Sequence, residues 1–227
     1  MAIILSIETS TPTCSIAVHK DNELLAKISI NRAQSHSSVL NPSIEAILKF
    51  CDLNLTDLSA VAISKGPGSY TGLRIGTSTA KGLCFSLCIP LIGINTLEAL
   101  AKQVTGINIS GSWLCPMLDA RRMEVYTMLL TPELERLVDT HPLILDHESF
   151  YSQLDSQSIL FFGNGSNKFQ TMIDHPNAHF INNVFPNAQN IGELASERFE
   201  KEEFEDLAYF EPFYLKEFKA TKPKTAI

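Results

Sequence analysis

A glycine-rich segment that joins a strand pattern to a helix pattern constrains this chain most. The apolar run 58–64 predicts a buried strand, and the apolar periodicity of 73–87 predicts a helix. The segment that links them is residues 64–76, SKGPGSYTGLRIG. Such a turn can bring several backbone N–H groups close to a phosphate, at the positive end of a helix dipole. The segment therefore predicts either a phosphate-binding loop or a tight turn that only joins two elements.

Two well-known phosphate motifs do not match this loop. No lysine follows Gly72, although the Gly-x-x-x-x-Gly-Lys-Ser/Thr pattern requires one. The third glycine of the Gly-x-Gly-x-x-Gly pattern comes one residue late, at Gly72. Spacing alone favours a joining turn over a nucleotide contact, because many such turns bind nothing.

Composition and charge exclude several classes of protein. The 227 residues are 44% hydrophobic and 19% charged, which suits two small domains with real cores. The formal net charge of −7 argues against a protein that wraps nucleic acid by itself, although it leaves room for a larger assembly that contacts RNA. The five cysteines form no Cys-x-x-Cys pair and predict free thiols. No apolar run reaches transmembrane length, so we expect a soluble cytoplasmic protein without membrane contact.

The order of predicted elements indicates two similar halves. In the first half we expect strands at 2–7, 14–19, 24–30, 58–64 and 89–93, with helices at 40–51, 73–87 and 97–104. After a linker at 106–112 we expect strands at 113–118, 123–130, 143–145 and 159–162, with helices at 149–154, 166–173 and 190–204. This order predicts an α/β protein with mixed sheets covered by helices. We place the domains at 1–105 and 106–215, with a flexible tail at 216–227.

Four segments of this sequence resemble the TsaB (YeaZ) family, in the order in which that family carries them. They are IETST at 7–11, KGPGSYTGLRIG at 65–76, LDARRMEVY at 118–126 and PFYLK at 212–216. The second of them is highly specific, and together the segments span nearly the whole chain. The resemblance implies the actin/Hsp70-like (ASKHA) fold, which consists of two tandem ribonuclease-H-like domains.

The same resemblance implies a function in tRNA modification. Family members help to make threonylcarbamoyladenosine (t6A), the modified adenosine beside the anticodon. The metal-containing paralogue TsaD transfers the threonylcarbamoyl group, and TsaB is its non-catalytic partner in a heterodimer. A small ATPase, TsaE, joins the pair. The resemblance further implies a homodimer when TsaB is alone, contact with tRNA only through the complex, and no cofactor beyond a possible nucleotide at the partner interface.

The loops that would contact a nucleotide in an actin-like fold are expected to be vestigial in this chain. Glu8 stands where the family commonly has Asp, and we interpret it as a remnant although it could still bind a metal. Asp119 is predicted to be a turn residue paired with Arg121 or Arg122, and the Gly163–Gly165 turn is expected to serve either adenosine or only helix entry. The residues assigned to these loops are Glu8, Thr9, Ser10, Gly66, Gly68, Ser69, Asp119, Gly163 and Gly165.

No catalytic or metal site is predicted. His175 and His179 have the His-x-x-x-His spacing, but Pro176 disfavours a regular helix between them. His36 is interpreted as a capping or surface residue, and no Gly-x-Ser-x-Gly elbow is present. The family's old grouping with glycoproteases thus finds no chemical support in this sequence. The alternative function is an ATP-dependent enzyme, a kinase or ATPase, that uses Glu8, the Gly66 loop and Asp119.

The helix after the glycine loop offers a second explanation for its glycines. Gly72, Gly76 and Ala80 are four residues apart, so they share one face on which another helix or a sheet can approach closely. The residues themselves do not decide between the chain's own core and an external partner, and the resemblance favours the partner. The predicted interface is Leu40, Ile44, Ile47, Gly72, Leu73, Gly76, Ala80 and Leu83. We expect Gly76→Arg to abolish pairing and to leave the fold largely intact.

Overall fold

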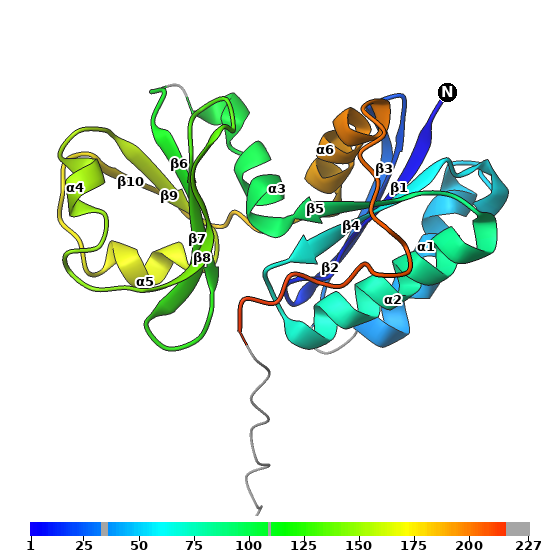
Figure 1. Ribbon diagram of the computed structural model, residues 1–227, viewed down its shortest axis with the longest axis horizontal. Coiled ribbons are helices and arrows are strands. Elements are labelled where there is room, and N and C mark those ends of the chain that lie inside the picture. Colours follow the sequence, from blue (N-terminus) through cyan, green and yellow to red (C-terminus); the bar gives the residue numbers. More distant parts are fainter. Residues whose placement is uncertain (33–35, 109, 217–227) are drawn as a thin grey trace, which may run out of the picture.

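The computed structural model describes residues 1–32, 36–108 and 110–216 (Figure 1). The flexible tail predicted from residue 216 lies outside the described residues, apart from Lys216 itself. No helix of the described part combines the length and the hydropathy needed to cross a membrane.

The first sheet is mixed, as predicted, and has the strand order β3-β2-β1-β4-β5. Its strands are β1 (Ile3–Glu8), β2 (Thr13–Lys20), β3 (Glu23–Asn31), β4 (Ala60–Gly66) and β5 (Leu91–Asn95). The first three form an antiparallel meander, whereas β4 and β5 run parallel to β1. Helices α1 (His36–Phe50) and α2 (Tyr70–Leu87) cover one face, and α3 (Thr96–Lys102) and α6 (Ala188–Glu200) lie on the other (Figure 1).

The second sheet repeats this arrangement with the order β10-β9-β6-β7-β8. Its strands are β6 (Trp113–Asp119), β7 (Glu124–Leu130), β8 (Arg136–Ile144), β9 (Ile159–Phe162) and β10 (Ala178–Ile181), accompanied by α4 (Tyr151–Leu154) and α5 (Ser166–Gln170). Short 3-10 helices occupy Leu55–Asp57 and Thr105–Ile107. Strand β8 is longer than the expected 143–145, and β10 was not predicted. Both are edge strands, whose sequences lack the apolar alternation by which a half-buried strand is identified.

The domain boundary needs one correction. Helix α6 does not cover the second sheet; it packs on β1, β2, β4 and β5 of the first. Its Ile191 and Ala195 share a core with Ile4, Ala60 and Ile92. The first domain therefore consists of residues 1–105 together with 188–216, so the predicted second domain of 106–215 is too long. The apolar stripe of α6 was identified correctly, but a stripe does not specify which sheet will bury it.

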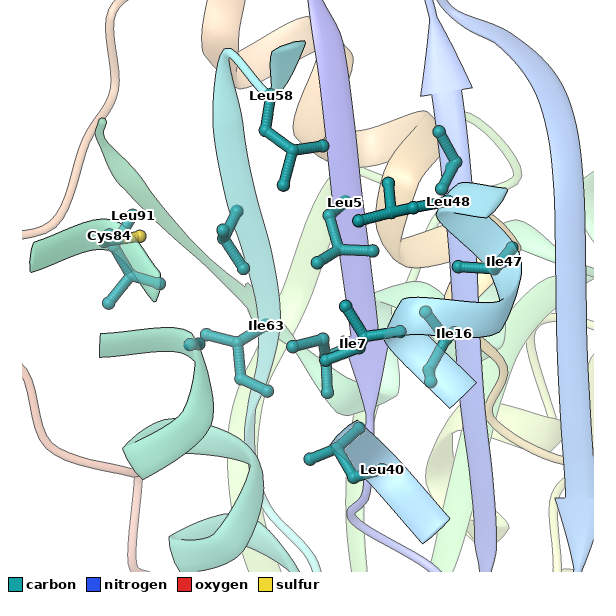
Figure 2. Close-up of a cluster of buried hydrophobic side chains, with 14 of the residues drawn as sticks. Leu5, Ile7, Ile16, Leu40, Ile47, Leu48, Leu58, Ile63, Cys84 and Leu91 are labelled. Carbon is teal, nitrogen blue, oxygen red and sulfur yellow. The ribbon is translucent and has the colours of Figure 1, made fainter. Parts of the chain in front are cut away.

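The core of the first domain lies between the central strands and helices α1 and α2. Leu5 and Ile7 of β1 and Ile63 of β4 meet Leu40 and Ile47 of α1 there, as Figure 2 shows, and all five side chains are at most 1% exposed. Burying one such aliphatic side chain contributes about 1.5–3 kcal/mol. This packing holds the ends of β1 and β4 rigidly, and the candidate site is built on those ends.

Candidate functional site

The turn between β1 and β2 and the glycine loop after β4 pack directly against each other. The Ser69 N–H donates to the Ser10 carbonyl oxygen at 2.7 Å, and a Cβ on Gly68 would lie 2.5 Å from the Ser10 Cβ. The Ser69 hydroxyl caps α2 by accepting from the Gly72 N–H at 3.3 Å. Two of the N–H groups that a phosphate would need are thus bonded within the chain.

The small-residue strip of α2 accommodates the β1–β2 turn. A Cβ on Gly72 would overlap the Thr9 carbonyl oxygen, and a Cβ on Gly76 would overlap the Thr9 hydroxyl and lie 2.9 Å from the Ile63 Cδ1. Both glycines are therefore required for close approach within the domain. The sequence left open whether this face of α2 meets the chain's own core or an external partner. Gly72 and Gly76 meet the chain's own β1–β2 turn and sheet.

Glu8 lies at the end of β1, where the side chain is fully buried. One carboxylate oxygen accepts from the Ser10 N–H at 2.5 Å, and the other has no hydrogen-bond partner among the described residues. Burial raises the pKa of this carboxyl above its ordinary value. A carboxylate must be ionised to bind a metal well, so this environment suits a remnant better than a ligand. In the described ranges no three His, Cys, Asp or Glu side chains are grouped as a metal site.

Glu8→Gln is expected to stabilise the fold in a pH-dependent way. Because its folded-state pKa is raised, Glu8 contributes most stability below its unfolded pKa, and that contribution is lost as pH rises through the folded pKa. The variant should therefore gain about 1–2 kcal/mol over the natural chain at high pH and little near pH 4. Burial also lowers the pKa of His19, but both proteins contain His19, so its contribution cancels when their free energies of unfolding are subtracted. Urea unfolding across pH measures the effect, and a difference independent of pH would contradict it.

The corresponding turn of the second domain is also closed by internal contacts. Asp119 accepts from the Arg121 N–H at 2.6 Å and forms an ion pair with Lys168, also at 2.6 Å. Asp119 is thus a turn residue paired with Arg121, through the backbone N–H of Arg121 rather than its guanidinium, and Lys168 of α5 is a second partner that was not predicted. Gly163 has φ +98° and approaches β6 at the Met117 carbonyl oxygen, to which the Gly165 N–H donates at 3.0 Å.

A C-terminal strap, residues 205–216, crosses the glycine loop. It starts on the edge strand β5, where Glu205 pairs with Leu91. Further along, the Phe213 N–H donates to the Lys65 carbonyl oxygen at 2.6 Å, and a Cβ on Gly66 would lie 2.8 Å from the Phe213 carbonyl oxygen. The strap therefore covers the loop that the sequence singled out. Sequence reasoning pointed to this segment only through its PFYLK motif.

The end of the strap reaches the second domain. In Figure 1 the red segment passes α2 and ends beside the lower ends of β7 and β8. The Tyr214 ring packs on Tyr70 of α2 with centroids 5.0 Å apart. Lys216 forms an ion pair with Glu124 of β7 and donates to the Ala120 carbonyl oxygen at 3.4 Å. The strap thus links the two domains beside the glycine loop.

Most of the predicted partner interface lies inside the domain. Seven of its eight members are buried: Leu40, Ile44, Ile47, Gly72, Leu73, Gly76 and Ala80. Ile44, which is 4% exposed, and the half-buried Leu83 line a groove of about 690 Å³ that is formed by α1, residues 52–55 and α2, and that also contains Glu45 and Lys49. The expectation for Gly76→Arg needs correction as well, because the arginine would collide with Thr9 and disrupt the fold rather than pairing alone.

The outward face of α2 carries a second strip of small residues, which sequence reasoning missed. Ser78, Gly82 and Ser86 are four residues apart and exposed, and a Cβ on Gly82 would meet nothing within 4 Å. The sequence shows the i, i+4 spacing of both strips, but it does not distinguish the outward strip from the inward strip of Gly72, Gly76 and Ala80. A partner helix could approach α2 closely along this face.

Comparison with known proteins decides the family. The family profile described as TsaD, tRNA N6-adenosine threonylcarbamoyltransferase, matches residues 23–224. The tRNA threonylcarbamoyladenosine biosynthesis protein TsaB of Bacillus subtilis is 35% identical over 175 residues, which are 75% of this chain and 75% of that protein. The chain belongs to the TsaB family. The Escherichia coli TsaB is 36% identical over 123 residues, 54% of this chain and 52% of that relative.

Solved structures confirm the predicted actin-like fold of this TsaB-family chain. YeaZ from Pseudomonas aeruginosa superposes with a TM-score of 0.83 at 23% identity, covering 95% of this chain and all of that one. A second structure from that organism, described as similar to peptidase YEAZ, gives 0.84 with the same identity and coverage. The activator of the 2-hydroxyisocaproyl-CoA dehydratase from Clostridium difficile, with ADPNP bound, has a TM-score of 0.51 at 11% identity and covers 90% of this chain and 98% of that one.

Proposed function

We propose that this chain is a non-catalytic subunit in threonylcarbamoyladenosine formation on tRNA, and that it acts by pairing with a TsaD-like transferase. The observation that carries the proposal is the match to TsaB relatives named for tRNA threonylcarbamoyladenosine biosynthesis. This role places the chain in the cytoplasm with its tRNA substrate. A TsaE-like ATPase and the tRNA would join through the complex rather than through this subunit alone.

The geometry of the vestigial loops supports a non-catalytic role. The Ser69 and Gly72 N–H groups are bonded to Ser10 and Ser69, and the strap covers Gly66. Glu8 is buried and Asp119 is held by Lys168. Phosphate binding at a helix start requires free N–H groups, so these contacts weigh against the alternative of an ATP-dependent enzyme.

The face of α1 and α2 is the pairing surface that we propose. It combines the groove, which is lined by Leu83 and by α1 residues that include Glu45 and Lys49, with the outer strip of Ser78, Gly82 and Ser86. A groove beside a smooth helix suits an amphipathic helix of the partner, whose side chains enter the groove as its backbone approaches α2. The same face would serve the homodimer when the partner is absent.

The test of this function is to deplete the protein in its own cells and measure nucleosides from bulk tRNA by mass spectrometry. We expect threonylcarbamoyladenosine to fall several-fold while other modified nucleosides stay constant, and re-expression of the chain to restore it. An unchanged level after verified depletion would contradict the proposal and favour the ATP-dependent enzyme.

A further inference from the structure

Basic residues gather at one place in this acidic chain. The turn between β6 and β7 carries Arg121 and Arg122, and two lysines converge on it. Lys168 of α5 donates to the Glu124 carbonyl oxygen at 3.1 Å, and Lys216 of the strap donates to the Ala120 carbonyl oxygen at 3.4 Å. We call this cluster, together with Arg74 of α2, the basic corner. It contrasts with the net charge of −7 for the whole chain.

The two arginines at the tip of the corner are available for an external anion. Both side chains are exposed, and neither guanidinium makes a hydrogen bond or ion pair with any residue of 1–32, 36–108 or 110–216. Their backbones have φ of +70° and +51°, a left-handed conformation that bulky residues rarely adopt. Lys168 and Lys216, by contrast, are engaged with Asp119 and Glu124.

Aromatic rings lie among these cations. Lys216 lies 5.5 Å from the centroid of the Tyr126 ring, and Arg74 lies 5.4 Å from that of Tyr70. Tyr214, two residues before Lys216, packs on Tyr70 and keeps 39% of its surface exposed. Tyr70 and Tyr126 are half-buried, so Tyr214 is the ring that this group exposes. An exposed ring beside arginine and lysine forms the kind of surface on which proteins stack unpaired bases and neutralise phosphates.

The sequence beyond the strap extends the same charge. Residues 217–227 contain Lys219, Lys222 and Lys224 against the single acidic Glu217. The strap ends at the corner, so these lysines follow directly from it in the chain. Basic terminal segments are typical of contacts with nucleic acid.

We propose that the basic corner contacts the sugar–phosphate backbone of an RNA, with Arg121 and Arg122 on phosphates and Tyr214 as a stacking surface. The inference rests on the proposed function, in which the RNA is a tRNA, and it adds a direct contact by this subunit. The acidic remainder of the chain keeps this contact weak on its own, in the range of about 10⁻⁴–10⁻⁶ M at physiological salt. The corner supplies a share of the affinity of a larger complex.

The experiment compares the full chain with a double variant, Arg121→Gln with Arg122→Gln, for binding to an unmodified tRNA transcript by fluorescence anisotropy across salt concentrations. The matched control, Lys20→Gln with Lys201→Gln, removes the same charge outside the basic corner, at the end of β2 and at the C-terminus of α6. We expect the natural chain and the control to bind alike. The corner variant should bind about ten-fold more weakly at low salt, with the slope of log affinity against log salt reduced by about 2.

Equal affinity and equal salt slope for the natural chain and the corner variant would overturn the inference, as would the absence of salt-dependent binding by the natural chain. If the corner variant kept its RNA affinity but lost co-elution with the transferase, the corner would contact an acidic protein surface instead. The depletion experiment separates the two levels. An unchanged t6A level after depletion overturns the proposed function. If t6A falls after depletion, and the corner variant restores it fully and binds RNA as tightly as the natural chain, only the RNA contact is overturned.

Discussion

Gly72→Ala is expected to lower the free energy of unfolding by about 3 kcal/mol, because the added methyl group must displace backbone rather than a flexible side chain. The obstacle is the Thr9 carbonyl oxygen in the turn between β1 and β2. That turn is itself tied to the glycine loop through Ser10 and Ser69, so it cannot move alone. Urea unfolding followed by circular dichroism measures the loss.

The matched control is Gly82→Ala in the same helix. Gly82 is exposed, and a Cβ there meets nothing within 4 Å, so the substitution changes helix propensity without a collision. It should raise the free energy of unfolding by about 0.5–1 kcal/mol. Opposite signs for two Gly→Ala changes in one helix would identify tight packing at Gly72 as the cause. If Gly72→Ala unfolded like the natural chain but failed to pair with the transferase, Gly72 would belong to an external interface after all.

Gly82→Arg is expected to weaken pairing with the TsaD-like transferase by about 100-fold while the isolated chain keeps its stability. Arginine is a better helix former than glycine, and the open surroundings of Gly82 accommodate it in the free protein. At a packed helix interface the same side chain would hold the partner helix away from α2, at a cost of about 3 kcal/mol. Co-elution from a sizing column, followed by titration calorimetry, measures the effect.

An equivalent substitution outside the proposed surface provides the control. Gly106, in the short 3-10 helix before the second domain, is also exposed, and a Cβ there would likewise meet nothing within 4 Å. Gly106→Arg should pair as the natural chain does. Unimpaired pairing by Gly82→Arg would place the interface away from the outer strip of α2, and equal loss in both variants would show that charge rather than position matters.

Periodic patterns explain why so much of the fold could be predicted. The central strands β1, β4, β6 and β9 are apolar runs, and the long helices α1, α2 and α6 have clear stripes. Their burial is dictated by composition, so local sequence predicts them well. The edge strands β3 and β5 were predicted, whereas β8 and β10, which lack a regular apolar alternation, were misjudged or missed.

The candidate site shows where such local reasoning stops. The sequence singled out Glu8, the glycine loop and Asp119 as one functional region, and the structure does place the turn after Glu8 in contact with the glycine loop. The sequence did not reveal that Lys168 pairs with Asp119, nor that residues 205–216 cover Gly66. Lys168 and Asp119 are 49 positions apart, and the strap is further still from Gly66 in the chain, so no short-range spacing encodes these contacts.

The sequence by itself determined the family, the two mixed sheets and the helix on which the glycines lie, because these depend on local motifs and on the period of apolar residues. Only the tertiary structure decided which side of α2 faces inward, since Gly72–Gly76 and Ser78–Gly82 have the same four-residue spacing. The physical reason is that a strip of small residues allows another element to pack closely but does not specify which element that is. Thr9 fills one strip and leaves the other open. The return of α6 to the first sheet was decided in the same way, by which apolar surface remained uncovered.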